Sequence, residues 1–327
     1  MTTTATTVNP PKNCLILSAE EWLTTDFRVE ESEILIGTPE HAIVRPLTKN
    51  LIQAPEKAYK TTFLLRLTLA LSIGDTVFPS LPANGSHRVL YLHGELAPAE
   101  LKERLQEAAR ELLRPLDQFF QGRSLSASLV TDQGRGAIRE LVEQYRPKVL
   151  VIDPWQSFIA GADENSFKEI SAATKFLDML ISDHGLTLFI AIHLGKDPSR
   201  GARGHSALAG WRDTKLTLKR EGSGLTVDVD PRWAKPPKPL KLTFHGGTLW
   251  EGDAPKWTKQ AESIRELLAA NGGEVTRESL KFGLGLDDSS LRMALKRAHD
   301  SGAIELDGET VRLPGCPVTA CVTTPPI

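Results

Sequence analysis

The stretch NLIQAPEKAYKTTFLLRLTLALSIG, residues 50–74, decides the fold of this chain. Residues 50–54 form a short, mostly apolar run that predicts a buried strand, and the leucine-rich residues 61–73 predict a helix that ends at Gly74. A tight loop, with Lys60 directly before Thr61, joins the two. A strand, a tight loop and a helix in this order form the first unit expected of a parallel sheet with crossover helices.

The same alternation continues to residue 244. Further buried strands are predicted at residues 89–92, 149–152 and 186–192, and helices at residues 97–113, 137–145 and 166–182. Four short runs, at residues 214–218, 225–229, 240–244 and 248–250, are predicted to be antiparallel additions to the sheet. The proline-rich residues 231–239 suit a stiff surface connection. The predicted class is therefore α/β, with a mostly parallel sheet flanked by helices.

The loop after the first strand stands where a GxxxxGK[ST] phosphate-binding loop would stand. Its residues are Ala54, Pro55, Glu56, Lys57, Ala58, Tyr59, Lys60, Thr61 and Thr62. Lys60 would contact phosphate oxygens, Thr61 would offer a hydroxyl to Mg²⁺, and the helix N-terminus would offer backbone N–H groups. Both glycines of the pattern are replaced, by Ala54 and Tyr59. The alternative is that Lys60 and Thr61 only begin an ordinary helix, but the preceding strand and a later acidic strand end favour the phosphate loop.

Two acidic residues follow predicted strands. Asp153 ends the run KVLVID, residues 148–153, at the sheet edge where α/β proteins bind ligands. It would hold Mg²⁺ beside Thr61, and the alternative is a helix cap or a solvated loop acid. Glu95 ends the run VLYLHGE, residues 89–95, and would orient and deprotonate an attacking water. The alternative for Glu95 is a favourable charge at the N-terminus of the next helix.

A histidine marks a third strand end. His193 follows the predicted strand at residues 186–192 and would sense the γ-phosphate through a hydrogen bond. A satisfied histidine in the core is an equal alternative at this stage.

Taken together, these motifs resemble the RecA-like ATPases of the group that contains plasmid RepA-type hexameric replicative helicases and their phage and mobile-element relatives. The resemblance covers residues 17–220. It implies that Glu95 is the catalytic glutamate, that Asp153 is the Walker B aspartate, and that the run from His193 to Lys196 is the histidine motif. Lys57 and Tyr59 look like a variation known in the group, whereas Ala54 departs from it.

The resemblance also implies ATP and Mg²⁺ as ligands and an assembly into a ring or filament. Arg203, in the basic glycine-containing stretch at residues 200–210, looks like a residue of the loop that faces the ring channel or the neighbouring subunit. Lys219 and Arg220 look like the pair that reaches the γ-phosphate across the subunit interface. For each of these residues a solvated basic side chain is an equal alternative.

A second domain is predicted after a boundary near Pro255. We expect a disordered segment at residues 1–16, the ATPase domain at residues 17–255, a winged helix at residues 256–313 and a disordered tail at residues 314–327. The third helix, residues 289–300, carries Arg292, Lys296 and His299 on one face, and a hairpin follows it. This arrangement favours DNA binding. Because acidic residues lie close by, a protein-docking or structural winged helix is a nearly equal alternative.

Composition limits the function classes. The net charge is −2, so contact with nucleic acid must come from a local patch. The three cysteines, Cys14, Cys316 and Cys321, fit neither a disulfide scaffold nor a metal cluster and favour a reducing compartment. The sequence has no signal peptide pattern and no apolar run that could span a bilayer, so a cytoplasmic protein is expected.

The sequence thus predicts an ATP-hydrolysing, RecA-like motor or helicase-type protein that acts on DNA in plasmid, phage or mobile-element replication. The rival function is a DNA-binding regulator or accessory protein that uses a degenerate nucleotide site only as a switch. The missing glycines favour the rival, whereas Lys60, Thr61, Glu95 and Asp153 favour the motor.

Overall fold

The structure is a computed structural model and describes residues 18–24, 33–76, 78–109, 112, 116–123, 128–161, 167–194, 206–222, 224–245, 247–253 and 257–314. It divides into two compact units, a large one that holds the elements up to residue 253 and a small one that holds those from residue 257. Each unit is described by itself. None of the helices in the described ranges is long and apolar enough to cross a membrane.

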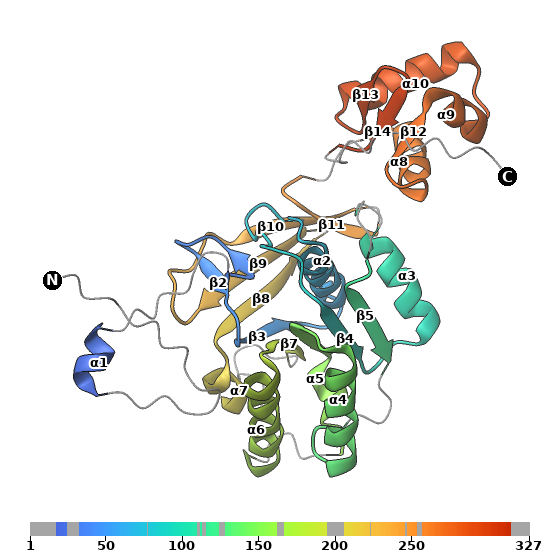
Figure 1. Ribbon diagram of the computed structural model, residues 1–327. Coiled ribbons are helices and arrows are strands. Elements are labelled where there is room, and N and C mark those ends of the chain that lie inside the picture. Colours follow the sequence, from blue (N-terminus) through green and yellow to red (C-terminus); the bar gives the residue numbers. More distant parts are fainter. Residues whose placement is uncertain are drawn as a thin grey trace. The chain divides into compact units, whose positions relative to one another are not determined.

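A nine-stranded sheet forms the centre of the large unit, with the strand order β11-β10-β9-β8-β3-β7-β6-β4-β5 (Figure 1). The parallel strands are β3 (Lys49–Ala54), β4 (Val89–His93), β5 (Phe119–Arg123), β6 (Val149–Asp153), β7 (Thr187–His193) and β8 (Thr214–Glu221). Three antiparallel strands extend one side, namely β9 (Gly224–Pro231), β10 (Leu240–His245) and β11 (Thr248–Glu251). The predicted α/β class with a mostly parallel sheet is confirmed.

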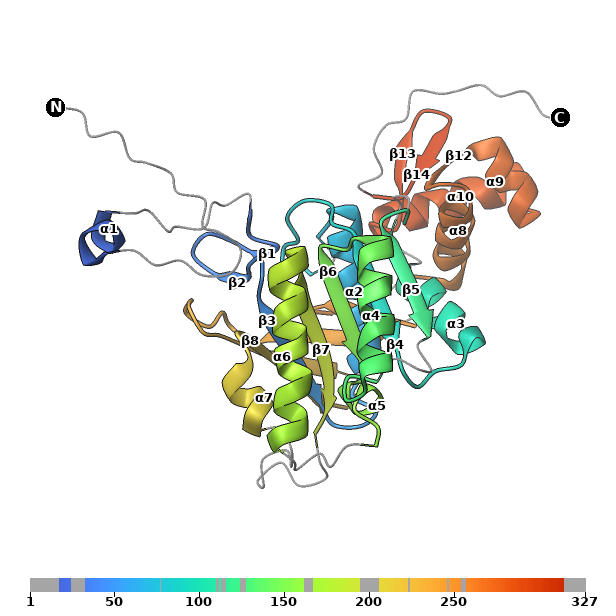
Figure 2. The ribbon, with the colours of Figure 1, turned by 60° about the horizontal axis from the view of Figure 1, so that its bottom comes forward.

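Helices cover both faces of this sheet. The described helices of the unit are α1 (Ala19–Thr24), α2 (Lys60–Ile73), α3 (Pro98–Ala109), α4 (Asp132–Tyr145), α5 (Trp155–Phe158), α6 (Phe167–His184) and α7 (Ser206–Trp211). Figure 2 shows α4 and α6 on one side of the sheet and α2 on the other. A small hairpin, β1 (Ile36–Gly37) with β2 (Ala42–Val44), precedes the sheet.

The period-two alternation of strand side chains explains these layers. In β6, Leu150 and Ile152 belong to the core cluster that includes Ile138 of α4 and Leu177 of α6. The alternate residues of the same strands point to the opposite face, where α2 packs against β3, β4 and β7. Along α2, only Thr61 is more than slightly exposed, so both sides of this helix are enclosed.

Three sequence predictions need correction. The run at residues 214–218 was expected to be an antiparallel addition, but β8 pairs in parallel with β3 and is antiparallel only to β9. The helix predicted at residues 97–113 is α3 (Pro98–Ala109), and residue 112 is not helical, while residues 110, 111 and 113 lie outside the described residues. The helix predicted at residues 137–145 begins earlier, at Asp132, because the side chain of Thr131 accepts a hydrogen bond from the Gly134 N–H and caps it.

In the small unit, the described residues form three helices and a three-stranded antiparallel sheet. Its elements are α8 (Lys259–Ala270), β12 (Glu274–Thr276), α9 (Arg277–Leu284), α10 (Asp288–Asp300), β13 (Glu305–Asp307) and β14 (Thr310–Arg312), with the sheet order β12-β14-β13. Leu291, Leu295 and Ala298 of α10 pack in its core with Ile264 of α8. Thr276 caps α9, and β13 and β14 pair as the predicted hairpin.

Candidate functional site

The carboxyl ends of four parallel strands meet at one edge of the large sheet. In the strand register, Ala54 of β3 lies opposite His193 of β7, and Asp153 of β6 lies opposite His93 of β4. The strand β7 lies between β3 and β6. Because the strands run in parallel, the loops that follow them open to the same edge, which is the usual ligand-binding edge of α/β sheets.

The predicted phosphate loop leaves β3 at Ala54 and enters α2 at Lys60. Two of its residues adopt left-handed backbone angles, Lys57 with a φ of 60° and Tyr59 with a φ of 53°. Tyr59 therefore has the conformation for which the loop pattern places a glycine. A non-glycine residue in this region costs about 1–2 kcal/mol, so the loop carries strain that other contacts must offset. Ala54, in contrast, ends a regular strand and needs no such angle.

Lys60 is the most unusual side chain of the site. Its side chain is only 6% exposed, and its Nζ is buried without a hydrogen-bond partner. Burial lowers the pKa of Lys60, and the negative charges of Asp153 and Glu95 oppose that shift. A buried ammonium without a partner is costly, and an anionic ligand would relieve that cost.

The start of α2 supplies further groups for an anion. No side chain caps this helix among the described residues, so its first N–H groups are available. Thr61 is half-buried in the first turn, directly after Lys60. The remaining loop side chains are less enclosed, because Pro55, Glu56 and Lys57 are exposed. Ala58 and Thr62 are buried.

Asp153 is buried at the end of β6, with 1% of the residue exposed. The Tyr91 hydroxyl donates a hydrogen bond of 2.6 Å to its Oδ2, and the Nε2 of His93 lies 3.6 Å from the same oxygen. Burial and the neighbouring Asp153 carboxylate raise the pKa of Tyr91 well above its usual value, so Tyr91 stays a donor. These neighbours fix the orientation of the carboxylate.

His93 connects Asp153 to the loop that holds Glu95. Its Nδ1 accepts hydrogen bonds from the N–H groups of Glu95, at 3.2 Å, and Leu96, at 3.3 Å. Burial lowers the pKa of His93, so the ring is neutral and its proton is on Nε2, facing Asp153. Sequence reasoning missed Tyr91 and His93. The sequence did contain a signal. Along β4, Tyr91 and His93 alternate with residues of the apolar core cluster, so both point to the other face of the sheet, on which Asp153 also lies.

Glu95 lies beside two other polar side chains. Its Oε1 is 3.8 Å from the Nε2 of His193 and 3.5 Å from the hydroxyl of Ser157. The preceding Gly94 donates its N–H to the Asp153 carbonyl at 2.9 Å, and a Cβ at position 94 would lie 2.3 Å from the Cβ of Ser157. Only glycine allows this close approach.

Burial of the ring is the main cause of the lowered pKa of His193, and the positive charge of Lys60 lowers this pKa further. The structure thus brings Lys60, Glu95, Asp153 and His193 together at one edge. Within the described residues, no group of three or more His, Cys, Asp and Glu side chains is placed to hold a metal ion by itself. A single carboxylate with a hydroxyl still fits Mg²⁺, because this ion keeps several waters and uses phosphate oxygens as ligands.

Arg220 lies on the phosphate loop of its own chain. Its Nη1 donates a hydrogen bond of 3.1 Å to the Lys57 carbonyl, and its guanidinium carbon lies 5.0 Å from the centre of the Tyr59 ring. Lys219, its neighbour in β8, forms an ion pair of 2.6 Å with Asp228. Contact of Arg220 with a neighbouring subunit stays a prediction. Arg203 and Lys196 lie outside the described residues.

The part of the chain that carries these residues is similar to a known family. A family model described as an AAA domain matches residues 46–199, which hold the phosphate loop, Glu95, Asp153 and His193. Residues 46–199 are thus similar to an AAA domain. A solved structure described as the ATPase domain of another protein is 15% identical, with a TM-score of 0.46, and the match covers 63% of this chain and 85% of that chain. No curated protein matches the chain. The family match supports ATPase activity for the large unit.

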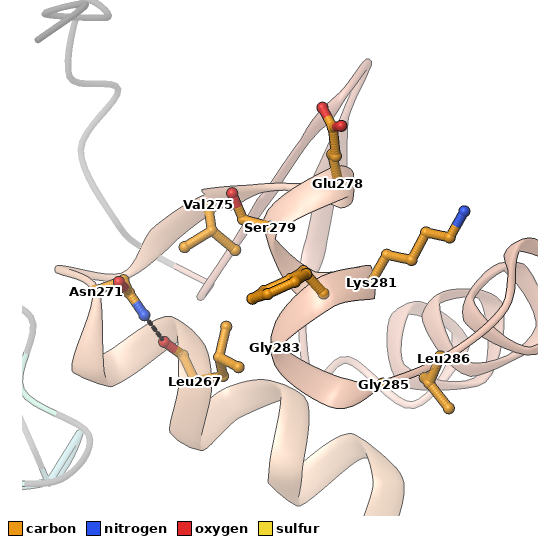
Figure 3. A pocket seen from close by; sticks show the side chains of 10 residues that line it. Leu267, Asn271, Val275, Glu278, Ser279, Lys281, Gly283, Gly285 and Leu286 are labelled. Atoms are coloured by element: carbon orange, nitrogen blue, oxygen red, sulfur yellow. Dashed lines mark hydrogen bonds between the residues drawn. The ribbon is translucent and has the colours of Figure 1, made fainter. Parts of the chain in front are cut away.

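The small unit has two distinct surface features. Arg292 and Lys296 are exposed on α10, as predicted. A hollow of about 940 Å³ lies elsewhere on the unit, between α8 and α9, and Leu267, Val275 and Leu286 line it together with polar residues (Figure 3). Phe282, which also lines this hollow, is 92% exposed. An exposed phenylalanine beside an apolar hollow is typical of a protein-docking surface.

Proposed function

We propose that the large unit binds ATP with Mg²⁺ and hydrolyses ATP, as a RecA-like P-loop ATPase. One observation carries the proposal: the buried Nζ of Lys60 has no partner and lies at the uncapped N-terminus of α2. A helix N-terminus with a neighbouring cation is a ready site for phosphate groups. The acidic strand end at Asp153 and the match of residues 46–199 to an AAA domain give further support.

In this proposal, each residue of the site has a defined part. Lys60 and the first N–H groups of α2 bind the phosphate oxygens. Thr61 and Asp153 would hold Mg²⁺, which would supply positive charge to offset that of the phosphates. Glu95 accepts a proton from the water whose oxygen attacks the γ-phosphorus. The bond from that phosphorus to the bridging oxygen breaks, and ADP and phosphate leave. In this proposal His193, whose Nε2 lies 3.8 Å from the Oε1 of Glu95, responds to the loss of phosphate.

We further propose that this activity serves a motor or helicase-type function on DNA, in plasmid, phage or mobile-element replication. A nucleotide-dependent regulator without sustained turnover is the second candidate, because Tyr59 and Ala54 replace the loop glycines. Measuring phosphate release by the purified chain, with and without single-stranded DNA, separates the two. We expect release that is faster with DNA. ATP binding without phosphate release under either condition would favour the regulator.

The small unit is proposed to be a winged helix that contacts DNA through α10. Its order of helix, strand, two helices and hairpin supports this assignment, and Arg292 and Lys296 are exposed on α10. Replacing both residues with alanine is expected to weaken binding to DNA of any sequence, since each contacts a phosphate. The slope of log affinity against log salt should fall by about one for each contact that is lost. Titrations of fluorescent DNA at several salt concentrations measure this slope.

The matched control for this prediction is Phe282→Ala, which removes the exposed ring beside the hollow and leaves the charge of α10 intact. It should leave DNA affinity unchanged. If the Arg292 and Lys296 double variant binds DNA with the wild-type affinity and salt slope, the unit is instead a partner-docking module, for which Phe282 is then the natural contact.

The active species is proposed to be an oligomer in which Arg203 acts on the site of a neighbouring subunit. Arg203→Ala is expected to impair hydrolysis without weakening ATP binding by the isolated subunit. Mixing this variant with Lys60→Ala should restore part of the activity, because each variant supplies the group that the other lacks. Activity of mixtures and light scattering under assay conditions test both points. Full activity of a strict monomer would contradict the proposal.

A further inference from the structure

The phosphate loop makes an aromatic contact that its amino-acid pattern does not require. The ring of Tyr59 stacks on Phe244 of β10, with ring centres 4.3 Å apart and an angle of 14° between the planes. The Arg220 guanidinium lies over the same Tyr59 ring, 5.0 Å from its centre. Stacked rings and a cation over an aromatic face both stabilise the position of the side chain that they hold.

Arg220 also holds the loop backbone. Its Nη1 donates to the carbonyl of Lys57, and its Nε donates to the carbonyl of Gly222, both at 3.1 Å. The guanidinium therefore joins the turn after β8 to the loop. Lys57 and Tyr59 are the loop residues with left-handed angles, and Arg220 contacts both of them.

We propose that Phe244 and Arg220 are positioning residues that hold the glycine-poor loop in its phosphate-binding shape, through Tyr59 and Lys57. This inference rests on the proposed ATP site. A glycine adopts a left-handed angle without support, but a tyrosine at this angle is strained, and its ring must then be held by contacts elsewhere. The contacts from β8 and β10 replace the missing glycine. In this inference Arg220 acts on the nucleotide site of its own chain, in place of the role across a subunit interface that the resemblance implies for it.

This inference can be tested, because a glycine at position 59 would not need the contacts that Phe244 and Arg220 make with Tyr59. Tyr59→Gly relieves the strained angle, so it is expected to bind ATP about tenfold more tightly than Tyr59→Ala. Tyr59→Ala keeps the strained angle but loses the ring contacts, and its dissociation constant should rise about tenfold, which corresponds to about 1.4 kcal/mol. Calorimetric titration of the full chain with ATP and Mg²⁺ measures both constants. Thermal unfolding without ligand shows that each variant is folded.

A double-mutant comparison then tests Phe244 and Arg220. Phe244→Ala should raise the dissociation constant about five- to tenfold with tyrosine at position 59, and by less than about twofold in the Tyr59→Gly background. Arg220→Ala should also raise it about five- to tenfold with tyrosine at position 59, and by a smaller factor in the Tyr59→Gly background, where only its hydrogen bond to the Lys57 carbonyl is lost. Lys241→Ala, an exposed cation on the same strand as Phe244, is the surface control. Equal losses in both backgrounds would overturn the inference, since Phe244 and Arg220 would then act on ATP or on the fold and not through Tyr59.

Hydrogen exchange of the ligand-free chain tests the same inference without ATP. Amides of residues 56–60 should exchange faster in Phe244→Ala and Arg220→Ala than in the wild type. In the Tyr59→Gly background, Phe244→Ala should make no further difference, and Arg220→Ala should make a smaller one through Lys57. Unchanged exchange in the single variants would contradict the inference. If the variants show these exchange differences but the wild-type chain binds no ATP, the proposed function is refuted while the loop contacts remain supported.

Discussion

Lys60→Ala is expected to abolish ATP binding and turnover by the full chain. The reason is that the phosphate oxygens of a bound nucleotide would lose the cation that compensates them in a buried place, where water cannot replace it. Titration of ATP with Mg²⁺ measures binding, and phosphate release measures turnover. Lys175→Ala, on the exposed surface of α6, is the control for the loss of a lysine charge. Hydrolysis at the wild-type rate by Lys60→Ala would show that the loop does not bind phosphate.

The same lysine should make the ligand-free chain less stable than it could be. Because burial lowers the pKa of Lys60, the folded chain disfavours its charged form. The free energy of unfolding should therefore rise as pH increases from the lowered pKa toward the unfolded value of about 10.5. Lys60→Met, which has a similar shape and no charge, should lack this pH-dependent gain and be more stable at neutral pH by about 1 kcal/mol or more. A less stable methionine variant would indicate that Lys60 has a structural partner.

Glu95→Gln is expected to retain ATP binding and to lower turnover by roughly 10²-fold or more, because an amide has the size of the carboxylate but cannot accept the proton. The side chain of Glu95 is half-exposed and lies within 4 Å of both His193 and Ser157, so a water could approach it. Single-turnover hydrolysis with saturating ATP measures the chemical step, and titration measures binding separately.

The alternative for Glu95 is that its charge only favours the N-terminus of α3. The structure offers a matched control, because the Oε2 of Glu100 accepts a hydrogen bond of 3.1 Å from the Ala97 N–H and so caps that helix. Glu100→Gln should leave turnover near the wild-type rate. If Glu95→Gln instead loses ATP binding and unfolds at a lower temperature, Glu95 supports the helix and not the reaction.

Much of the fold could be predicted because strong local patterns carry it. The runs that became β3, β4, β6 and β7 are apolar and short, and a helix was predicted after each of the first three. The edge strand β5 was missed, since its residues Gln121, Gly122 and Arg123 lack the apolar pattern of a buried strand. The direction of β8 was predicted wrongly, because an apolar run shows that a strand forms but not which neighbour it pairs with.

The positions of Asp153 and His193 could be predicted, because each is a polar residue at the end of an apolar strand. It was less predictable where a role depends on contacts between distant segments. The sequence showed that Tyr59 replaces a glycine, but not that Phe244 and Arg220, far along the chain, contact its ring. The orienting role of His93 likewise depends on hydrogen bonds from the loop that follows it.

The position of β7 between β3 and β6 explains how opposite charges can remain separate in a buried place. Neighbouring strands lie about 4.8 Å apart, so one intervening strand separates the ends of β3 and β6 by roughly 10 Å. Lys60 and Asp153 attract each other, yet the ammonium forms no hydrogen bond. Had β3 and β6 been adjacent, the two side chains would be close enough to neutralise each other, and the site would be closed by its own ion pair. In the proposed site, the intervening strand is a spacer that keeps both charges open to a third, phosphate-sized group.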